Sequence, residues 1–492
     1  TTTLRGTLRA MIENHTVPIL AHSTAHLSAG TPGVVLVSYT RRAVRNIAKQ
    51  MPEELKSHCL TIHKLLEFAP EYYEEYNEEG KMVTKMRFSP TRNRMNPLPR
   101  TLTKIVIDES SMVSIELYEL LLDALPNPSE VQFIFLGDLN QLPPVYGQAV
   151  LGLKLLELPI VELTQVYRQA LESPIISLAL SIKNNNFAQF NKDAHELWGA
   201  PRLWDAKKVE ERITLDKPGR GKVTLVPWKK RYDPEFSLRA VKERIPVWIK
   251  EQFYDPAEDL MLCPWNKSFG TDELNKSIAD TLGKMREAVV WEVIAGYNKH
   301  YLAVGDKMMI DKQEAWILDI YRNPKYIGKR TQKESKDLNR WGRNLAGVTE
   351  FDETDSLDVD ALISAFESEE AVEDRTAQSS HIIKVRFIDT DETMLIDKAA
   401  TVNASSFAYA ITVHKAQGSE CRKVFFITDF CHAAMLSREL VYTGITRAAE
   451  ELVILMSPQM LATAAAKPRI KGDTLAAKLE FFNQRLKERI EE

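Results

Sequence analysis

Ile105-Val-Ile-Asp108-Glu109-Ser-Ser-Met112 is the stretch of sequence from which the fold can be worked out. Its first three residues are apolar without alternation, which indicates a strand buried on both faces of a parallel sheet. Two adjacent carboxylates follow the strand directly. Because ligands of such sheets bind beyond the carboxyl ends of the strands, the stretch predicts an α/β domain with Asp108 and Glu109 at its site.

Similar unbroken apolar runs recur along the chain, at 34–37, 133–136, 424–427 and 452–456. Between them, amphipathic segments such as 41–51 and 114–125 have the spacing of helices. The alternation of strand and helix occurs in two blocks, before about residue 170 and again from about residue 255. We therefore expect two α/β domains.

The composition limits the class of protein. The chain has 492 residues, with 64 basic and 68 acidic side chains and 44% hydrophobic residues. At about 150 residues per domain this suggests roughly three globular domains, and it excludes collagen-like, coiled-coil and wholly disordered chains. The net charge of −4 means that a nucleic-acid site would have to be a local groove.

Cellular location is also constrained by the sequence. It has no apolar stretch long enough to cross a membrane and no apolar core of a signal peptide. Its four cysteines are scattered, which excludes a disulfide framework or a Cys-x-x-Cys zinc site. We expect a cytoplasmic protein without membrane partners, associated with a nucleoid or, for a phage protein, located in the host cytoplasm.

Two loops carry residue types that phosphate chemistry needs. Asp108, at a strand end, is suited to holding a Mg²⁺ ion, and Glu109 can reach a water molecule beyond it. In Leu136-Gly-Asp-Leu-Asn-Gln141-Leu-Pro-Pro144 the prolines stiffen the loop, and the neutral amide of Gln141 can contact a terminal phosphate without repelling it. Each pattern taken alone is equally compatible with an ordinary surface turn.

Two arginines follow in similar motifs. Arg168 ends Val161-Glu-Leu-Thr-Gln-Val-Tyr-Arg168, and Arg447 lies in Val441-Tyr-Thr-Gly-Ile-Thr-Arg-Ala448. An arginine brought to the γ-phosphate neutralises developing charge and contributes on the order of 10³-fold or more to the rate. A single arginine is usually part of a surface ion pair, but the order of all these motifs argues against that interpretation.

Together the motifs resemble those of superfamily 1 helicases, specifically superfamily 1B, the branch of the RecD and phage Dda helicases. Asp108-Glu109 is similar to motif II, 137–141 to motif III, Arg168 to motif IV, Thr412-Val-His-Lys-Ala-Gln-Gly-Ser-Glu420 to motif V, and Tyr442-Thr-Gly-Ile-Thr-Arg447 to motif VI. Val37-Ser-Tyr-Thr40 is similar to motif Ia, Thr61-Ile-His63 to the small motif after it, and Asn266 to the segment that opens the second motor domain. The resemblance spans most of the chain.

This resemblance implies two RecA-like parallel-sheet motor domains with ATP between them. It further implies an ATP-dependent DNA helicase that moves 5′ to 3′ on single-stranded DNA, with forked or tailed duplexes as substrates and single-strand-binding, replication or recombination proteins as partners. Glu109, Gln141, Arg168 and Arg447 would act in catalysis. The resemblance implies that Thr1 and Asp108 bind the Mg²⁺ ion. The other implied contacts to the nucleotide are Gln141, Arg168, Gly418, Glu420 and Arg447. The implied DNA contacts are Thr40, Thr61, His63, Tyr72, Tyr76, Asn266, Thr412 and His414.

One family motif is absent from the sequence. The Walker A loop, Gly-x-x-x-x-Gly-Lys-[Ser/Thr], does not occur, and the chain opens with Thr-Thr-Thr-Leu-Arg, which usually follows that Gly-Lys. We expect Thr1 to correspond to the Mg²⁺-binding threonine and upstream residues to be missing. Without the loop's backbone amides and lysine, the chain as printed is expected to hydrolyse ATP poorly.

Several segments depart from the strand–helix alternation. The first motor domain is predicted at 1–63 and 101–170, and the second at 171–315 and 401–492. Residues 64–100 alternate around a glycine turn, which predicts a β-hairpin with a basic face, and the family has a strand-separating pin at this position. Residues 316–400 are predicted as a β-rich, SH3-like insertion, and 200–235 as a basic surface loop. Inside the insertion, 349–375 holds eleven acidic residues against the single Arg375, so we expect it to be flexible.

Three other functions fit the same sequence. The chain could be an RNA helicase of the same superfamily, because motifs that contact the backbone distinguish RNA from DNA poorly. It could be the motor subunit of a recombination or nuclease complex. It could also be a non-enzymatic binding protein built on a decayed motor, although the presence of Asp108, Glu109, Gln141, Arg168 and Arg447 argues against decay.

Overall fold

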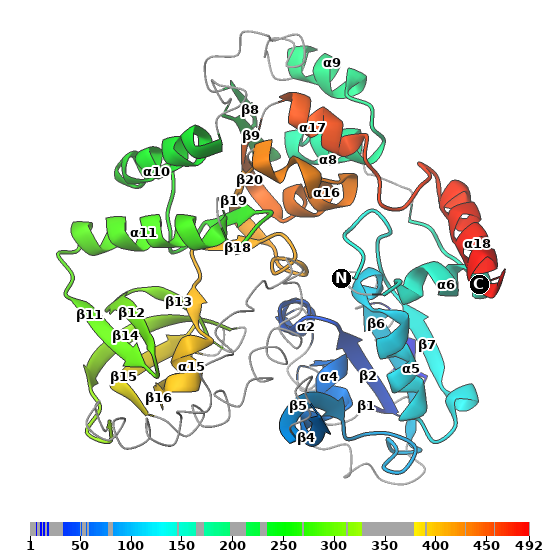
Figure 1. The fold of residues 1–492 in the computed structure, drawn as a ribbon. Helices are drawn as coiled ribbons and strands as arrows, with labels where there is room; N and C mark the ends of the chain where they lie inside the picture. Colours follow the sequence, from blue (N-terminus) through cyan, green and yellow to red (C-terminus); the bar gives the residue numbers. More distant parts are fainter. Residues whose placement is uncertain are drawn as a thin grey trace.

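The computed structural model is a mixed α/β protein with two separate parallel sheets, to which antiparallel units are attached (Figure 1). It describes residues 6, 10–11, 13–14, 17–18, 33–49, 51, 56, 59–76, 82–144, 147–163, 172–196, 213–226, 234–267, 270–310, 313–326, 378–388, 391–428, 430–456 and 458–491. In these ranges no helix is both long and apolar enough to cross a membrane.

The first parallel sheet has the strand order β1-β2-β6-β7, with β3 also paired to β2. Its strands are β1 (Val17–Pro18), β2 (Gly33–Ser38), β3 (Cys59–Thr61), β6 (Leu102–Asp108) and β7 (Gln132–Phe135). The associated helices are α2 (Arg41–Lys49), α4 (Ile62–Leu65), α5 (Ile115–Asp123) and α6 (Val150–Glu157), with short 3-10 turns η2 (Ser110–Met112) and η3 (Pro128–Glu130).

The central strands of this sheet are buried on both faces, as their unbroken apolar sequence predicts. Ile105 and Ile107 of β6 pack in one core cluster with Leu117 of α5. Val106, which points to the opposite face, packs in a second cluster with Ile47 of α2. Helices therefore cover both faces, and the polar residues that follow β6 emerge at the carboxyl edge of the sheet.

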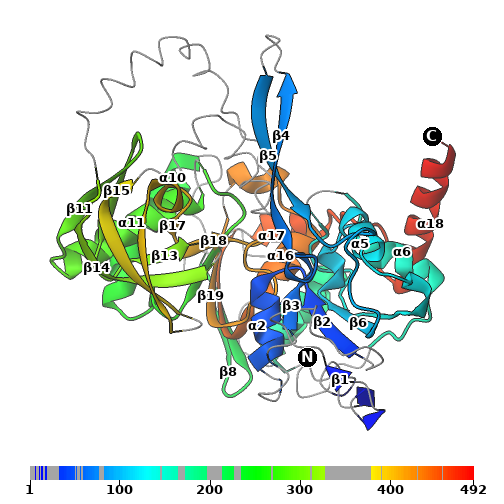
Figure 2. The ribbon, with the colours of Figure 1, turned by 90° about the horizontal axis from the view of Figure 1, so that it is seen from below.

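A long antiparallel hairpin interrupts this sheet between β3 and β6. It consists of β4 (Phe68–Tyr76) and β5 (Met82–Pro90), paired in register from Phe68↔Pro90 to Tyr76↔Met82. Figure 2 shows the hairpin projecting away from the body of the molecule. The predicted β-hairpin at 64–100 is thus present, although its tip lies outside the described residues.

The second sheet has the order β18-β10-β19-β20-β9-β8 and is parallel except for the β8–β9 pair. Its strands are β8 (Ile213–Lys217), β9 (Gly221–Leu225), β10 (Leu260–Cys263), β18 (Ala410–Thr412), β19 (Cys421–Ile427) and β20 (Ala448–Leu455). The helices of this part are α8 (Pro174–Lys183), α9 (Ala188–Glu196), α10 (Pro234–Lys250), α11 (Thr271–Met285), α16 (Arg438–Ile445), α17 (Pro458–Ala465) and α18 (Leu475–Glu491), and Phe430–Ala434 forms a 3-10 turn.

The prediction of a basic surface loop at 200–235 is wrong for its central part. Residues 213–225 form the β8–β9 hairpin, and β9 pairs with β20 at the edge of the second sheet. Leu215 and Val223 are fully buried in the core there. The apolar residues of the two strands alternate with polar ones, but the charged turn between the strands led us to expect a surface loop.

The third part is antiparallel. It comprises the pair β11 (Val290–Ala295) and β12 (Asn298–Ala303), and a sheet of order β16-β15-β14-β13-β17. The strands of this five-stranded sheet are β13 (Lys307–Ile310), β14 (Gln313–Arg322), β15 (Gln378–Phe387), β16 (Thr393–Lys398) and β17 (Ser406–Phe407). The short helix α15 (Ala399–Asn403) lies beside them. This β-rich region extends beyond the predicted 316–400, because β13 and β17 pair into the same sheet. The acidic stretch 349–375 lies outside the described residues, and the SH3-like description and the exact domain boundaries stay predictions.

The β-rich region touches the first parallel-sheet part through charged side chains. Arg42 of α2 forms an ion pair with Glu314 of β14, and Glu314 also pairs with Lys307, whose Nζ lies 3.3 Å from Oε2. Burial lowers the pKa of Lys307 to about 8. This charged contact connects the antiparallel region to the helix that follows β2.

The loop that leaves β7 requires glycine at position 137. A Cβ built there would lie 2.7 Å from Ser110 Oγ and 3.1 Å from the backbone nitrogen of Ser111. We predict that Gly137→Ala lowers the free energy of unfolding by about 1–3 kcal/mol, the usual cost of overpacking. Urea denaturation measures the change. Gly283→Ala is the control, since its Cβ would meet nothing within 4 Å in helix α11, and we expect it to stabilise by about 0.5–1 kcal/mol. Equal stability of the two variants would contradict this account of the loop.

Candidate nucleotide site between the two parallel sheets

The candidate site begins where β6 ends. Asp108 is the last residue of β6, and Glu109 follows it with φ of 52°, in the left-handed region. The next residue, Ser110, is fully buried and donates its hydroxyl to the carbonyl of Leu136 at 2.8 Å. The turn therefore joins the ends of β6 and β7 and holds the two carboxylates at the sheet's carboxyl edge.

Burial affects the protonation of both carboxylates. It raises the pKa of Asp108, and the backbone N–H of Glu109 partly opposes the rise. It also raises the pKa of Glu109; the positive charge of Arg447 opposes this, while Asp108 and Asp138 add to it. Two acidic groups in one poorly solvated corner favour a cation beside them.

Arg447 reaches this corner from the second sheet, where it follows α16. Its side chain is 7% exposed and donates to the carbonyls of Thr443 at 3.0 Å and Ser419 at 3.1 Å. Burial lowers the pKa of this guanidinium, and the nearby charge of Glu109 opposes the change. The arginine is thus held rigidly and lies within electrostatic reach of Glu109.

The loop after β7 is bonded to the second sheet at several points. Tyr442 of α16 donates its hydroxyl to Asp138 Oδ2 at 3.0 Å. Leu142 donates its backbone N–H to Thr443 Oγ1 at 3.0 Å and accepts from Gln417 Nε2 at 3.2 Å. Residues far apart in the chain therefore close the gap between the two sheets.

Gln141 lies in the middle of this bonded loop. Its backbone N–H donates to the carbonyl of Asp138 at 3.1 Å. Its side-chain Oε1 is buried, and none of the residues that the structure describes forms a hydrogen bond with it. A buried acceptor without a donor is costly, so a water molecule or a ligand that donates to it would fit this position.

The turn at 412–420 also contacts the first sheet. Gly418 has φ of +73°, and a Cβ there would lie 2.6 Å from that of Ala43 in α2. Asn46 of α2 donates its amide to the carbonyl of Gly418. Glu420 is exposed, and its charge acts on Arg447. The predicted nucleotide contacts Asp108, Gln141, Gly418, Glu420 and Arg447 all lie at this junction of the two parallel-sheet parts.

The candidate DNA-contacting hydroxyls are engaged locally. Thr40 Oγ1 accepts from the N–H of Ala43 at 3.1 Å, and Thr61 Oγ1 from the N–H of Lys64 at the same distance. Thr412, which is 4% exposed, accepts from the N–H of Lys415 at 3.3 Å. In this conformation the three hydroxyls stabilise turns and helix starts.

The remaining DNA candidates are partly buried. His63 packs against Tyr39 and Phe68, with ring centroids 5.6 and 4.8 Å apart. Burial lowers the pKa of His414 to about 4, so this imidazole is neutral at neutral pH. Asn266 accepts the hydroxyl of Thr271 at 3.1 Å.

Some predicted site residues fall outside the described part of the chain. Thr1 and Arg168 are among them. The backbones of Tyr72 and Tyr76 lie in β4, but their side chains are not described.

The carboxylates of the site determine which metal ion it could bind. Within the described ranges no group of three or more His, Cys, Asp or Glu side chains could hold a metal ion. Magnesium bound with a polyphosphate needs only one or two protein carboxylates. The carboxylates of Asp108 and Glu109, whose pKa values are raised by burial, fit that requirement.

Three contact residues were not singled out from the sequence. Gln417, Tyr442 and Thr443 occur within recognisable motifs, but only the structure places them on the loop after β7. Their positions within motifs V and VI were the signal that could have identified them.

The comparisons with known proteins agree with this arrangement. Residues 1–147 match the family described as AAA domain, and residues 407–455 match the UvrD-like helicase C-terminal domain. The chain is 25% identical to the ATP-dependent RecD2 DNA helicase of Deinococcus radiodurans over 432 residues, which is 87% of this chain and 44% of that protein. It is 36% identical to the RecBCD enzyme subunit RecD of Haemophilus influenzae over 76 residues, 15% of this chain and 12% of that protein. The chain thus spans less than half the length of either relative.

Solved structures with a weaker likeness include two Pif1 helicases. The Candida albicans protein is 15% identical with a TM-score of 0.40, and the match covers 98% of this chain and 92% of that one. Bacteroides Pif1 bound to single-stranded DNA is 13% identical with a TM-score of 0.41, covering 93% and 92%. These TM-scores lie below 0.5, and the likeness supports no conclusion about this chain.

The raised pKa of Asp108 leads to a prediction about stability. Because the folded state holds the proton more tightly than the unfolded state, the charged carboxylate destabilises the fold increasingly as the pH rises from about 4 through the folded pKa. We predict that Asp108→Asn raises the Tm by a few degrees at pH 7.5. The difference should close as the pH falls towards 4. Calorimetry across this range measures it; a Tm gain that is independent of pH would contradict the assignment.

Proposed function

We propose that this chain, a RecD-like member of helicase superfamily 1, is the motor part of an ATP-dependent DNA helicase. The observation that carries the proposal is the junction at which Glu109, directly after β6, comes within electrostatic reach of Arg447. Backbone carbonyls of the second part hold that arginine in place. An acid from one parallel-sheet part and an arginine from the other are the groups that phosphoryl transfer to water needs.

In this proposal ATP binds between the two parallel sheets. Asp108 and Thr1 would hold Mg²⁺, and the ion would neutralise charge on the phosphates. Glu109 would accept a proton from the attacking water, a role that suits a carboxylate whose pKa is raised by burial. The buried Oε1 of Gln141 would accept a hydrogen bond from that water.

Arg447 would act on the γ-phosphate from the second sheet. Its hydrogen bonds to backbone carbonyls hold the guanidinium in place before the reaction, so little reorganisation is needed when charge develops. Arg168 is proposed for the same phosphate, on its sequence motif alone. Gly418 and Glu420 would border the nucleotide from the same side as Arg447.

The contacts between the sheets support reversible closing. Those on the loop after β7 involve Gln417, Tyr442 and Thr443, and each is a single hydrogen bond. Such a bond is worth about 0.5–1.5 kcal/mol net between neutral groups and about 1.5–3 kcal/mol where one group is charged, as for Tyr442 and Asp138. Such bonds can be made and broken in each cycle of nucleotide binding and release. Closing and opening would then alternate the grip on single-stranded DNA.

For DNA we propose contacts to the sugar–phosphate backbone along both motor parts. The neutral imidazole of His414 could donate an N–H to a phosphate but would not form an ion pair at neutral pH. Thr412 would have to become exposed first, since it is buried in this conformation. Thr40, Thr61, His63 and Asn266 are proposed for the same strand. Movement in the 5′-to-3′ direction and protein partners remain predictions.

The projecting hairpin is proposed as a strand-separating pin. Its two strands are paired over nine positions and extend away from the first sheet, which gives a rigid support for a fork contact (Figure 2). Tyr72 and Tyr76 are the proposed stacking residues, since aromatic side chains stack on bases without reading sequence.

The role of Glu109 can be tested by Glu109→Gln in the full-length protein. Loss of the general base should reduce ATP hydrolysis stimulated by single-stranded DNA by about 10²–10⁴-fold. Glu119→Gln, at an exposed position on α5, is the matched control and should hydrolyse ATP like the wild type. Turnover by Glu109→Gln at the control rate would refute the proposed site.

The pin is tested by shortening the hairpin. Residues 75–83 are replaced by Asn-Gly, which joins the paired residues Glu74 and Thr84 through a two-residue turn. We expect loss of most duplex unwinding with ATP hydrolysis retained, because the nucleotide site is untouched. A forked substrate and single-stranded DNA, assayed side by side, separate the two activities. Parallel loss of both would contradict a pin.

A further inference from the structure

The last helix, α18, connects the two motor parts in an unexpected way. It follows the second sheet in sequence, yet both ribbon views show it beside α6 of the first (Figures 1 and 2). The two helices approach closely: a Cβ added to Gly152 of α6 would lie 2.5 Å from the ring of Phe482. The helix is therefore docked on the first part by close packing.

One lysine of α18 is directed into the loop after β7. Lys478 is 6% exposed, and its Nζ donates to Asn140 Oδ1 at 2.6 Å and to the carbonyl of Leu139 at 3.5 Å. Burial lowers the pKa of this ammonium group, and the negative charge of Asp138 opposes that change. A buried lysine is costly, and these loop oxygens and the nearby charge offset its cost.

The hydrogen bonds continue from Lys478 through the loop. Asn140 donates its amide to Asp138 Oδ1 at 2.7 Å, and its backbone N–H donates to the same oxygen at 2.9 Å. Asp138 Oδ2 accepts from Tyr442. The backbone N–H of Gln141 donates to the Asp138 carbonyl. The loop that carries Gln141 is thus fixed from α18 at one point and from α16 at another.

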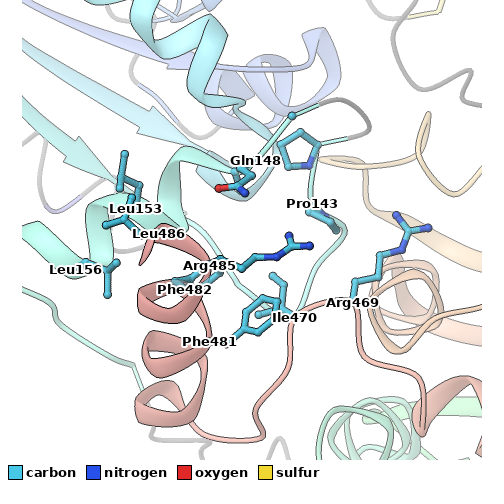
Figure 3. Close-up of a pocket in the computed structure, with 13 residues that line it drawn as sticks. Pro143, Gln148, Leu153, Leu156, Arg469, Ile470, Phe481, Phe482, Arg485 and Leu486 are labelled. Atoms are coloured by element: carbon cyan, nitrogen blue, oxygen red, sulfur yellow. The ribbon is translucent and has the colours of Figure 1, made fainter. Parts of the chain in front are cut away.

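The end of the loop is not tightly packed against α18. A cavity of about 150 Å³ lies between the end of the loop and α18. Pro143 and Gln148 border it on the loop side, and Phe481, Phe482 and Leu486 on the helix side (Figure 3). Beside this cavity, Lys478 supplies hydrogen bonds from α18 to the loop.

We propose that Lys478 is a positioning residue for nucleotide hydrolysis, which holds the loop of Asp138, Asn140 and Gln141 in its reactive arrangement. The inference rests on the proposed function, since it assigns Lys478 to the same site. Lys478 does not touch the nucleotide in this scheme; it acts through Asn140. Docking of α18 then becomes a requirement for full turnover.

The test is Lys478→Met in the full-length protein, with two measurements. The kcat of DNA-stimulated ATP hydrolysis should fall by roughly 10- to 100-fold with little change in KM for ATP, because misplacing a reacting group by about 1 Å costs up to ~10² in rate. Hydrogen–deuterium exchange should become faster at 138–142. Lys478→Arg, which keeps the charge and donors, should recover part of both.

Lys487→Met is the matched control, because Lys487 lies on the same helix but is exposed. It should leave kcat and exchange unchanged. A wild-type kcat and wild-type exchange in Lys478→Met would overturn the inference. So would equal losses in Lys478→Met and Lys478→Arg accompanied by a lower Tm, since that pattern indicates only structural support.

Failure of the proposed function gives a different result. If the wild type hydrolyses no ATP, the proposed function fails, and exchange alone decides whether Lys478 fixes the loop. Faster exchange at 138–142 in Lys478→Met, but not in Lys487→Met, would uphold the positioning role. Unchanged exchange would overturn it. Gly152→Leu, which should displace α18 through Phe482, is expected to reproduce the faster exchange with Lys478 intact.

Discussion

Opposite charges that meet at the junction of the two parallel-sheet parts are the constraint on which the rest of this structure depends. Asp108 and Glu109 end a strand of the first sheet, and Arg447 follows a helix of the second. A buried charge left unpaired costs several kcal/mol. Glu109 and Arg447 each oppose the effect of burial on the other's pKa, so the two sheets are favoured with these edges facing each other.

Hydrogen bonds at the same loop accompany this electrostatic contact. Tyr442, Thr443 and Gln417 reach the loop after β7 from one direction, and Lys478 reaches it from another. Individually weak bonds of this kind permit two arrangements that differ by a few kcal/mol, as an opening and closing motor requires. The same loop carries Gln141, so the state of the junction and the geometry of the site are coupled.

Strands β2, β6, β7, β19 and β20 of the parallel sheets could be predicted from the sequence because runs such as 105–107 and 424–427 are apolar without interruption. The carboxylates at the end of β6 followed from the same rule, and Arg447 from its motif. The β8–β9 hairpin at the edge of the second sheet was missed. Lys478 could not be found in this way, since its partner Asn140 lies 338 positions away and no local pattern records that contact. The neutral state of His414 was missed for a similar reason: it results from burial by distant residues.

The central claim is that Glu109 and Arg447 act on the same phosphate, and a double-mutant cycle tests it most directly. Single-turnover ATP hydrolysis is measured for the wild type, Glu109→Gln, Arg447→Lys and the double variant. When two groups act together on one transition state, the rate losses caused by substituting each of them do not multiply in the double variant. We predict that the double variant is about as slow as the slower single variant. Rate losses that simply multiply would contradict the account.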